Sequence, residues 1–290
     1  MKKRSNNLPF MLRAMRWAYP RMERYMPWLA ERVFRLVFYV PLTYRVPEKE
    51  TEMAKSATWF SLHANGKKVQ CYQWGKDDQP YVLLVHGWAG RATQFRKFIP
   101  AFNEAGFRVI GFDGPAHGKS EGTRTSIMEF EQVVIQLVEK LGKPTGVVTH
   151  SFGGAAMLYA AMNGLVIPRL VNIASPSMED EILKTYLRAI NGSWVSAERF
   201  KQYVIRRTGK SFEQFTGLYA IQRLPRPIDL LVIQDEDDEE VLMVQADTLI
   251  RAYPKARLFK TSGLGHNRVL KDEGVIKATI DFIRNSVTPQ

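Results

Sequence analysis

The chain of 290 residues contains a single cysteine, Cys71. One cysteine cannot form an intrachain disulfide, and it cannot supply the ligands of a zinc finger or of a cysteine-held iron cluster. A reducing compartment, the cytoplasm, is therefore the simplest expectation. The sequence also lacks internal repeats and low-complexity tracts. Its 45% hydrophobic and 24% charged residues are typical of a globular protein, which excludes wholesale disorder and a fibrous repeat.

Long hydrophobic runs are absent as well. Lys2, Lys3 and Arg4 are not followed by an uninterrupted apolar stretch of ~7–15 residues, so we expect no secretory signal. The most apolar stretch, Trp28–Val40, would reach only ~20 Å as a helix, which is too short to span a bilayer. It also contains acidic and basic residues, so we expect no membrane-spanning segment there.

Acidic residues are scarce at the N-terminus. Residues 1–45 hold ten Lys or Arg and two acids, whereas the other 245 residues carry only +4 of the total net charge of +12. The basic isoelectric point therefore belongs largely to an N-terminal arm. A nucleic-acid-binding protein needs a basic face or a dedicated arm, and the nearly neutral body leads us to expect no nucleic-acid partner.

The N-terminal arm has the apolar spacing of a helix, carried by Met22, Tyr25, Met26, Leu29, Val33, Leu36, Val37 and Val40. Pro27 predicts a kink or a new first turn, and Pro41 ends the pattern. We assign residues 1–56 to a basic amphipathic helical extension. Three interpretations stay open: a helix packed on the domain, an interfacial helix that contacts a membrane through residues 1–45 or shields a substrate entrance, and an RNA-binding arm.

From residue 57 the pattern changes to strands. Two strand-like segments at 58–63 and 67–74 flank Asn65 and Gly66, a strong hairpin signal. Short apolar strands then alternate with helices, with strands at 81–86, 108–113, 146–150, 170–174, 230–234 and 257–261 and helices at 94–105, 127–141, 152–162, 244–252 and 275–285. Apolar strands of this kind are covered by helices on both faces. The sequence predicts a mostly parallel sheet with an antiparallel edge, formed by residues 57–175 and 228–290.

Residues 176–227 interrupt the alternation. No convincing strand lies in this segment, and its apolar residues fall on helical faces around 182–190, 200–204 and 212–219. We therefore expect a helical insertion between two strands of the sheet.

A serine lies at the point where a predicted strand passes into a predicted helix, in the segment from Thr149 to Gly154. A serine hydroxyl becomes a useful nucleophile when a tight strand–turn–helix elbow exposes it beside a base. Gly153 and Gly154 allow the backbone to bend and the helix to approach. The helix N-terminus adds backbone N–H groups and a positive dipole. Ser151 is the candidate nucleophile.

The elbow requires a base and an acid. Among five histidines, His266 follows the last strand in a glycine-rich loop and is the best candidate for the general base. The strand at 230–234 ends in a run of acids, from which we select Asp238, with Asp235 second, to orient the imidazole. A calcium loop is the competing interpretation of this run, but it lacks the spaced Asx pattern and the turn glycine. The chain order of Ser151, Asp238 and His266 is that of one known class of triad.

The remaining component is an oxyanion hole. His86-Gly87-Trp88 follows the first parallel strand, and the backbone N–H groups of Trp88 and Phe152 are the candidates to hold a substrate oxygen.

Together these motifs resemble those of the α/β-hydrolase superfamily over roughly residues 57–287. The resemblance is carried by the motifs His86-Gly87-Trp88, Phe112 to Ser120, His150 to Gly154, Asp238 to Val241, and Gly265-His266. It implies an eight-stranded sheet, a Ser-His-Asp triad, and a small helical cap formed here by 176–227. The chain departs from the family at Thr149, where glycine is usual, and at Gln234, where histidine is usual. A serine nucleophile argues against dehalogenase and epoxide-hydrolase members, which use aspartate.

A second motif imitates a phosphate-binding loop. The segment from Asp113 to Ser120 follows a strand and ends in Gly-Lys-Ser. Asp113 stands where that loop needs its first glycine, and its carboxylate would repel phosphate. We interpret the segment as a structural turn that Asp113 and His117 hold in place.

The sequence therefore predicts a serine hydrolase, similar to esterases, lipases and aminopeptidases, that cleaves a carboxylic ester, thioester or amide of a small apolar substrate through an acyl-serine. No cofactor or metal is expected. An acyltransferase with the same triad is the near alternative, since only exclusion of water separates the two outcomes. A catalytically silent module for binding or membrane tethering is the other.

Overall fold

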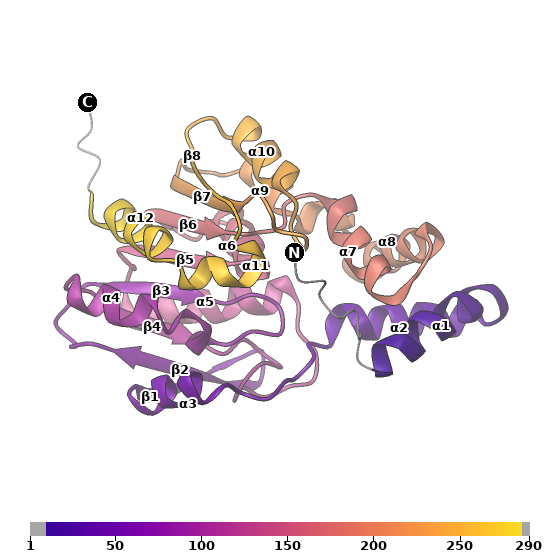
Figure 1. Ribbon diagram of the computed structural model, residues 1–290, viewed down its shortest axis with the longest axis horizontal. Helices are drawn as coiled ribbons and strands as arrows, with labels where there is room; N and C mark the ends of the chain where they lie inside the picture. The colour runs from indigo at the N-terminus through magenta and orange to yellow at the C-terminus, as the bar shows by residue number, and fades with distance from the viewer. Residues whose placement is uncertain (1–9, 286–290) are drawn as a thin grey trace. The chain divides into compact units, whose positions relative to one another are not determined.

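The computed structural model describes residues 10–285 (Figure 1). Lys2, Lys3 and Arg4 of the basic arm lie outside the described residues. The chain divides into two compact units. We call residues 40–178 and 215–290 the sheet unit, and residues 1–39 and 179–214 the helical unit.

The sheet unit is built on eight strands in the order β1-β2-β4-β3-β5-β6-β7-β8. Their bounds are β1 (Thr58–Ala64), β2 (Lys67–Trp74), β3 (Tyr81–Val85), β4 (Arg108–Phe112), β5 (Gly146–His150), β6 (Arg169–Ile173), β7 (Asp229–Asp235) and β8 (Arg257–Thr261). β2 runs antiparallel to β1 and β4, and the remaining pairs from β4 to β8 are parallel. This confirms the expected eight-stranded, mostly parallel sheet with an antiparallel edge.

The β1–β2 hairpin turns at Asn65 and Gly66, which have φ angles of 51° and 72°. A two-residue turn with positive φ at both positions matches the right-handed twist of the strands, and Asn-Gly tolerates it best. The hairpin predicted from this dipeptide is confirmed.

Helices surround the sheet in the sheet unit. Their bounds are α3 (Glu48–Lys55), η1 (Ala92–Phe95), α4 (Phe98–Glu104), α5 (Ile127–Leu141), α6 (Phe152–Met162), α9 (Gly217–Ile221), α10 (Met243–Ala252), α11 (Gly265–Arg268), η3 (Val269–Lys271) and α12 (Glu273–Arg284). The predicted single helix at 94–105 is wrong at its start. It divides into η1 and α4, because Pro100 has no N–H to donate and is tolerated only in a first helical turn.

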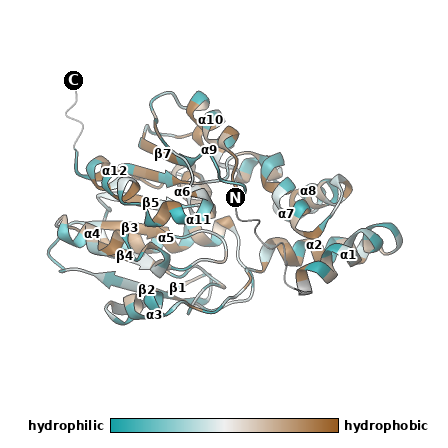
Figure 2. Ribbon diagram, viewed as in Figure 1, coloured by the Kyte–Doolittle hydropathy of each residue, from teal (hydrophilic) through white to brown (hydrophobic). Residues whose placement is uncertain are grey.

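Two hydrophobic cores lie on the two faces of the sheet. Along β3, Leu83 and Val85 pack in one core with α5 and α6, while Val82 and Leu84 pack in the other with α4 and α12. Alternate residues of a strand point to opposite faces, so a strand buried on both sides must be apolar throughout. Figure 2 shows the hydrophobic colour of these central strands. The helices predicted on both faces are confirmed.

The helical unit contains two N-terminal helices and two helices of the segment between β6 and β7. They are α1 (Phe10–Tyr25), α2 (Pro27–Tyr39), α7 (Glu179–Ile190) and α8 (Trp194–Thr208); η2 (Phe212–Phe215) follows them. α2 begins at Pro27, so of the two outcomes expected for this proline, a kink or a new first turn, the structure has the new first turn. None of the helices within residues 10–285 is both long and apolar enough to cross a lipid bilayer.

Aromatic side chains form the core of the helical unit. Phe34 of α2 and Phe200 of α8 are almost fully buried, and their ring centroids are 5.2 Å apart. The phenol of Tyr19, which is fully buried in α1, shares a hydrogen bond of 2.6 Å with the hydroxyl of Ser196. These contacts join α1 and α2 to α8.

Candidate active site

The candidate nucleophile lies at a strained turn between β5 and α6. Ser151 has a φ of 52° and a ψ of −125°, a backbone conformation that residues other than glycine rarely adopt. Its N–H donates to the carbonyl of Ile173 at 2.9 Å, which ties the turn to β6. Strain of this kind persists only where the surrounding structure enforces it, and it is concentrated at functional sites.

The hydroxyl of Ser151 is not used to stabilise the helix. Serine at this position usually accepts a hydrogen bond from the first turn, but Ser151 makes no such capping bond. Among residues 10–285 its hydroxyl makes no hydrogen bond at all. Ser151 therefore keeps its hydroxyl available for chemistry.

Gly153 allows α6 to approach the end of β3. A Cβ added at this position would collide with the carbonyl oxygens of Val85 and His86. Because no side chain larger than hydrogen fits there, packing requires glycine at this position of the elbow.

Thr149 departs from the family's usual glycine without disturbing the elbow. Its side chain is fully buried, and its hydroxyl lies 3.0 Å from the carbonyl oxygen of Val171 and 3.1 Å from Oδ1 of Asn172. Both partners belong to β6. A threonine is thus accommodated here by hydrogen bonds to the neighbouring strand.

The candidate base and acid are in direct contact. Nδ1 of His266 lies 2.8 Å from Oδ2 of Asp238. The other carboxylate oxygen accepts the N–H groups of Glu240 at 2.8 Å and Val241 at 2.9 Å. A histidine beside a carboxylate carries its proton on the nitrogen that faces it. Nε2 of His266 is therefore left as the acceptor, as a general base requires.

The electrostatics of this pair favour an ionised carboxylate and a more basic imidazole. Burial acts to raise the pKa of Asp238, but the hydrogen bond and charge of His266 and two backbone N–H groups lower it below its usual range. Burial acts to lower the pKa of His266, but the bond to Asp238 and the charges of Asp238 and Glu240 raise it overall. Each partner thus stabilises the charged form of the other.

Asp235, the second choice for the acid, has a different role. Its carboxylate accepts the N–H of Gly265 at 2.8 Å and of Leu264 at 3.1 Å, and the hydroxyl of Thr261 at 2.7 Å. Burial acts to raise its pKa, while these donors and the N–H of Asp237 lower it overall. Asp235 therefore anchors the loop that carries His266.

The residue before the serine joins the elbow to this loop. Nε2 of His150 lies 2.9 Å from the carbonyl oxygen of His266, and the two ring centroids are 4.7 Å apart. Burial lowers the pKa of His150 to about 3, so its ring is neutral and donates this bond. The sequence does not indicate this role, because a strand residue carries no signal for a contact 116 residues away.

Glu240 lies on the other side of the imidazole. One of its carboxylate oxygens is 3.8 Å from Nε2 of His266, and its side chain is 61% exposed. It belongs to the same acidic run as Asp238, and no feature of the sequence distinguished it.

The turn after β3 lies against the serine. The N–H of Gly90 donates to the carbonyl of Gly87 at 3.0 Å and closes the turn that carries Trp88. A Cβ on Gly87 would come within 2.8 Å of Cβ of Ser151. The rings of Trp88 and Phe152 are 5.4 Å apart. Phe152 is the first residue of α6, so its N–H has no partner within the helix.

The segment that imitates a phosphate-binding loop is a structural turn, as predicted. The buried carboxylate of Asp113 accepts the N–H groups of Ala92 at 3.0 Å and Lys119 at 2.9 Å. Nε2 of His117 accepts the N–H of Ala89 at 3.1 Å. The carboxylate of Asp113 thus accepts the backbone N–H groups of this turn, so they are not available to a phosphate.

Within residues 10–285 no group of three or more His, Cys, Asp or Glu side chains is placed to hold a metal ion. In the acidic run at the end of β7, the carboxylates of Asp235 and Asp238 instead accept hydrogen bonds from backbone N–H groups, and that of Asp238 also from His266.

Comparison with known proteins relates part of this chain to a known family. A family model described as alpha/beta hydrolase fold matches residues 80–194. The chain is 37% identical over 130 residues to the magnesium-chelatase 30 kDa subunit of Rhodobacter capsulatus, which is 41% of this chain and 45% of that protein. It is 30% identical over 98 residues to the bifunctional esterase/perhydrolase DCH of Acinetobacter calcoaceticus, which is 33% of this chain and 36% of that protein. The chain thus spans less than half the length of these relatives.

Solved structures agree on the fold. The crystal structure of a membrane phospholipase A, a bacterial virulence factor, superposes with a TM-score of 0.61 at 14% sequence identity. The match covers 95% of this chain and 98% of that chain.

Proposed function

We propose that this chain, a member of the α/β-hydrolase fold family, is a serine hydrolase that cleaves carboxylic esters, with thioesters and amides as chemical neighbours. The observation that carries the proposal is the hydrogen bond between His266 and Asp238, which follows the carboxyl end of β7. The strained serine follows the carboxyl end of β5, which is parallel to β7 in the same sheet. Ser151 is the nucleophile, His266 the base and Asp238 the acid that orients it.

In the first step Nε2 of His266 takes the proton of the Ser151 hydroxyl as the oxygen attacks the substrate carbonyl carbon. The tetrahedral intermediate collapses, the bond to the leaving alcohol breaks, and His266 returns the proton to the alcohol. A water molecule then loses its proton to His266 and attacks the acyl-serine, which releases the acid and restores the hydroxyl. Asp238 holds the imidazole in the correct tautomer and stabilises its charged form throughout.

The oxyanion is held by the backbone N–H groups of Trp88 and Phe152 in this proposal. Support comes from their location: the turn of Trp88 is in contact with the elbow, and Phe152 begins α6 directly after the nucleophile. A single donor of this kind contributes ~10²–10³-fold to the rate.

The substrate has an apolar part next to its ester. The half-buried rings of Trp88 and Phe152 meet edge to face at 5.4 Å and belong to segments that adjoin the nucleophile. Apolar walls with a few directed polar groups are typical of small-molecule sites.

The test is a panel of p-nitrophenyl esters with acyl chains of two to twelve carbons. Wild type should hydrolyse at least one of them, and Ser151→Ala should reduce kcat by about 10⁶-fold, as removal of a serine nucleophile does elsewhere. Ser61→Ala, on β1, is the matched control and should keep full activity. Adding an acceptor alcohol distinguishes hydrolysis from acyl transfer, since a transferase forms the new ester in preference to the acid.

A silent binding module is the second candidate. It is favoured by one observation: a relative at 37% identity is named as a subunit of a chelatase rather than as a hydrolase. Hydrolysis of none of the esters, together with no reaction of Ser151 with a phosphonate, would support this candidate instead.

A further inference from the structure

Two exposed stripes on the helical unit combine arginine with bulky apolar side chains. On α1 the stripe consists of Arg13, Trp17 and Arg21, and on α2 of Trp28, Arg32 and Leu36. Residues four apart lie on one face of a helix. All six side chains are exposed, with Trp17 at 64% and Trp28 at 66%. Tryptophan is highly buried on average, and each of the two helices exposes one.

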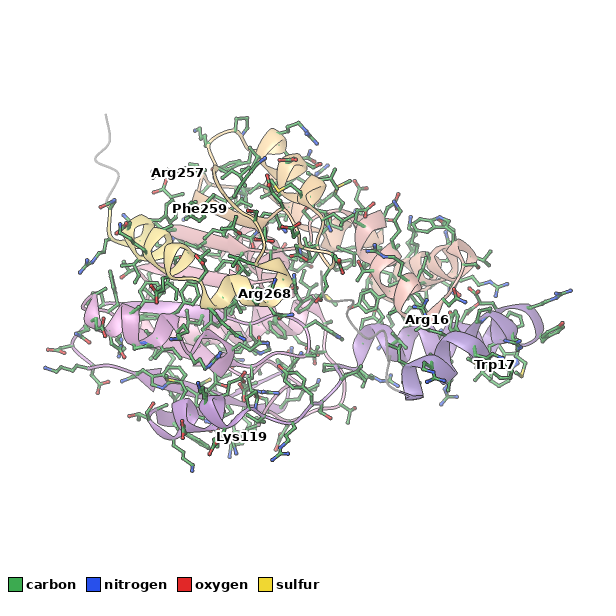
Figure 3. The ribbon with its side chains drawn as sticks, in the orientation of Figure 1. Arg16, Trp17, Lys119, Arg257, Phe259 and Arg268 are labelled. Carbon is green, nitrogen blue, oxygen red and sulfur yellow. The ribbon has the colours of Figure 1, made fainter. Side chains whose placement is uncertain are left out.

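The opposite faces of α1 and α2 are buried in the interior of the helical unit. Tyr19 on α1, and Ala30 and Phe34 on α2, are almost fully buried. At ~100° per residue they lie roughly opposite the stripes. Arg16 is next to Trp17 in the sequence (Figure 3). Its guanidinium donates to the carbonyl of Arg188 on α7. The fold therefore determines which side of each helix remains open.

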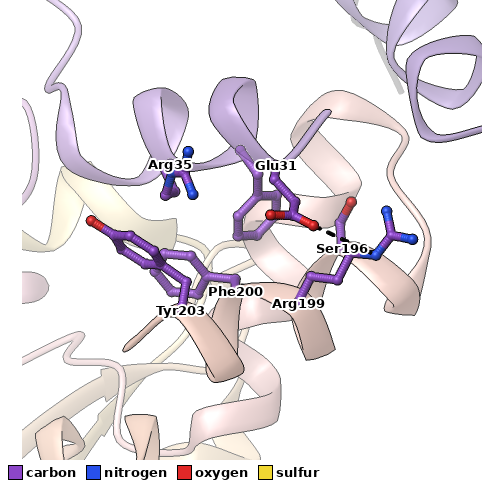
Figure 4. Close-up of a pocket in the computed structure, with 7 residues that line it drawn as sticks. Glu31, Arg35, Ser196, Arg199, Phe200 and Tyr203 are labelled. Carbon is purple, nitrogen blue, oxygen red and sulfur yellow. Dashed lines mark ion pairs between the residues drawn. The ribbon is translucent and has the colours of Figure 1, made fainter. Parts of the chain in front are cut away.

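The two acids of this segment are directed away from the stripes. Glu23 accepts hydrogen bonds from the hydroxyls of Ser193 and Ser196, at 3.0 and 2.6 Å. Glu31 forms an ion pair of 3.7 Å with Arg199, at a hollow between α2 and α8 (Figure 4). Both carboxylates are thus engaged with α8 and its first turn. The stripes keep three arginines and no acid.

One arginine and the tryptophan of the α1 stripe also contact each other. The guanidinium carbon of Arg21 lies 4.0 Å from the centroid of the Trp17 ring, and its Nη1 donates to the carbonyl of Trp17 at 2.6 Å. A guanidinium that stacks on an indole keeps its remaining N–H groups free for a phosphate.

We propose that these stripes bind the surface of a phospholipid bilayer that contains anionic lipid. Phosphate and carboxylate head groups complement the three arginines, and the indole rings fit the boundary between head groups and acyl chains. The exposed side chain of Leu36 argues against a nucleic-acid partner. Its aliphatic side chain is 39% exposed beside Arg32 and has a favourable environment among acyl chains but none along a phosphate backbone. The proposal does not depend on the hydrolase activity.

The test uses the full-length protein and vesicles of phosphatidylcholine, alone or with 30% phosphatidylserine, in a co-sedimentation assay at 0.1 M salt. Wild type should bind the anionic vesicles and be released at 0.5 M salt, where screening is stronger. Arg21→Gln/Arg32→Gln should weaken the partition coefficient about 30-fold, because each basic residue at such a surface contributes roughly fivefold. Arg124→Gln/Arg226→Gln removes the same charge from exposed positions of the sheet unit and should leave binding within twofold.

The double variant Trp17→Ala/Trp28→Ala tests how much the two indole rings contribute to vesicle binding. We expect it to lose most of the binding while keeping the wild-type circular dichroism and melting temperature, because both rings are largely exposed. Three results would overturn the proposal: no binding of wild type to anionic vesicles, equal loss in the Arg124→Gln/Arg226→Gln control, or tighter binding to a duplex oligonucleotide than to vesicles. Ester hydrolysis without lipids, measured in parallel, is expected to be unchanged in all stripe variants. The failure of this proposal is therefore distinguishable from the failure of the hydrolase function.

Discussion

Replacing Asp238 with asparagine should abolish the proposed ester hydrolysis without unfolding the chain, for a reason that lies in the hydrogen bonds of its carboxylate. Oδ1 of Asp238 accepts two backbone N–H groups, from Glu240 and Val241, at 2.8 and 2.9 Å. An amide NH₂ cannot accept them, so the oxygen of the new side chain must take this position. The NH₂ group is then directed at Nδ1 of His266, where Oδ2 lies now at 2.8 Å.

An imidazole that faces an NH₂ group must accept at Nδ1. Its proton then moves to Nε2, and the nitrogen that should take the proton of Ser151 becomes a donor. A wrong tautomer of this kind reduces kcat by about 10⁴-fold where a triad aspartate has been changed in this way, which corresponds to ~5.4 kcal/mol of activation free energy. The loss of the carboxylate charge also removes support for the imidazolium.

The assay is the kcat of Asp238→Asn on the best p-nitrophenyl ester, with Asp229→Asn as the matched control. Asp229 is exposed at the start of β7, so the control should turn over like wild type. Melting temperatures establish that both variants fold. Turnover of folded Asp238→Asn within tenfold of wild type would refute the reasoning and remove Asp238 from the proposed triad.

Two further predictions concern pH. Glu240→Gln removes a charge that raises the pKa of His266, so the acidic limb of kcat/KM should move to lower pH in a titration of activity; a move to higher pH contradicts this account. Burial lowers the pKa of His86 to about 4, and of His117 and His150 to about 3, from ~6.5 in the unfolded chain. Unfolding takes up protons below pH 6.5, so urea denaturation should show stability falling there with decreasing pH, by about 1.4 kcal/mol per pH unit for each histidine fully protonated on unfolding. Constant stability between pH 6.5 and 4.5 would contradict it.

The strands of the sheet could be predicted because burial on both faces leaves a short, continuous apolar run in the sequence. β2, β5 and β8 begin and end where the sequence predicted. One helix start was less well placed. α12 begins at Glu273, two residues before the predicted start, since the carboxylate of Asp272 accepts the N–H of Val275. This capping hydrogen bond sets the start of α12, and the spacing of apolar residues carries no information about it.

Contacts between distant segments could not be predicted. The spacing of apolar residues predicted the apolar face of α2. That spacing does not indicate that Phe34 packs on Phe200 or that Tyr19 shares a hydrogen bond with Ser196. The candidate site shows the same limit. Its motifs indicated Ser151, Asp238 and His266, while the bond from His150 to the loop of His266 depends on tertiary structure alone.

The most direct test of the central claim is whether Ser151 is an activated nucleophile. Purified protein is treated with a fluorophosphonate, beside Ser151→Ala, and the adducts are read by intact mass. The account predicts one adduct on wild type and none on the variant. No adduct on wild type, or an adduct that persists on Ser151→Ala, would contradict it.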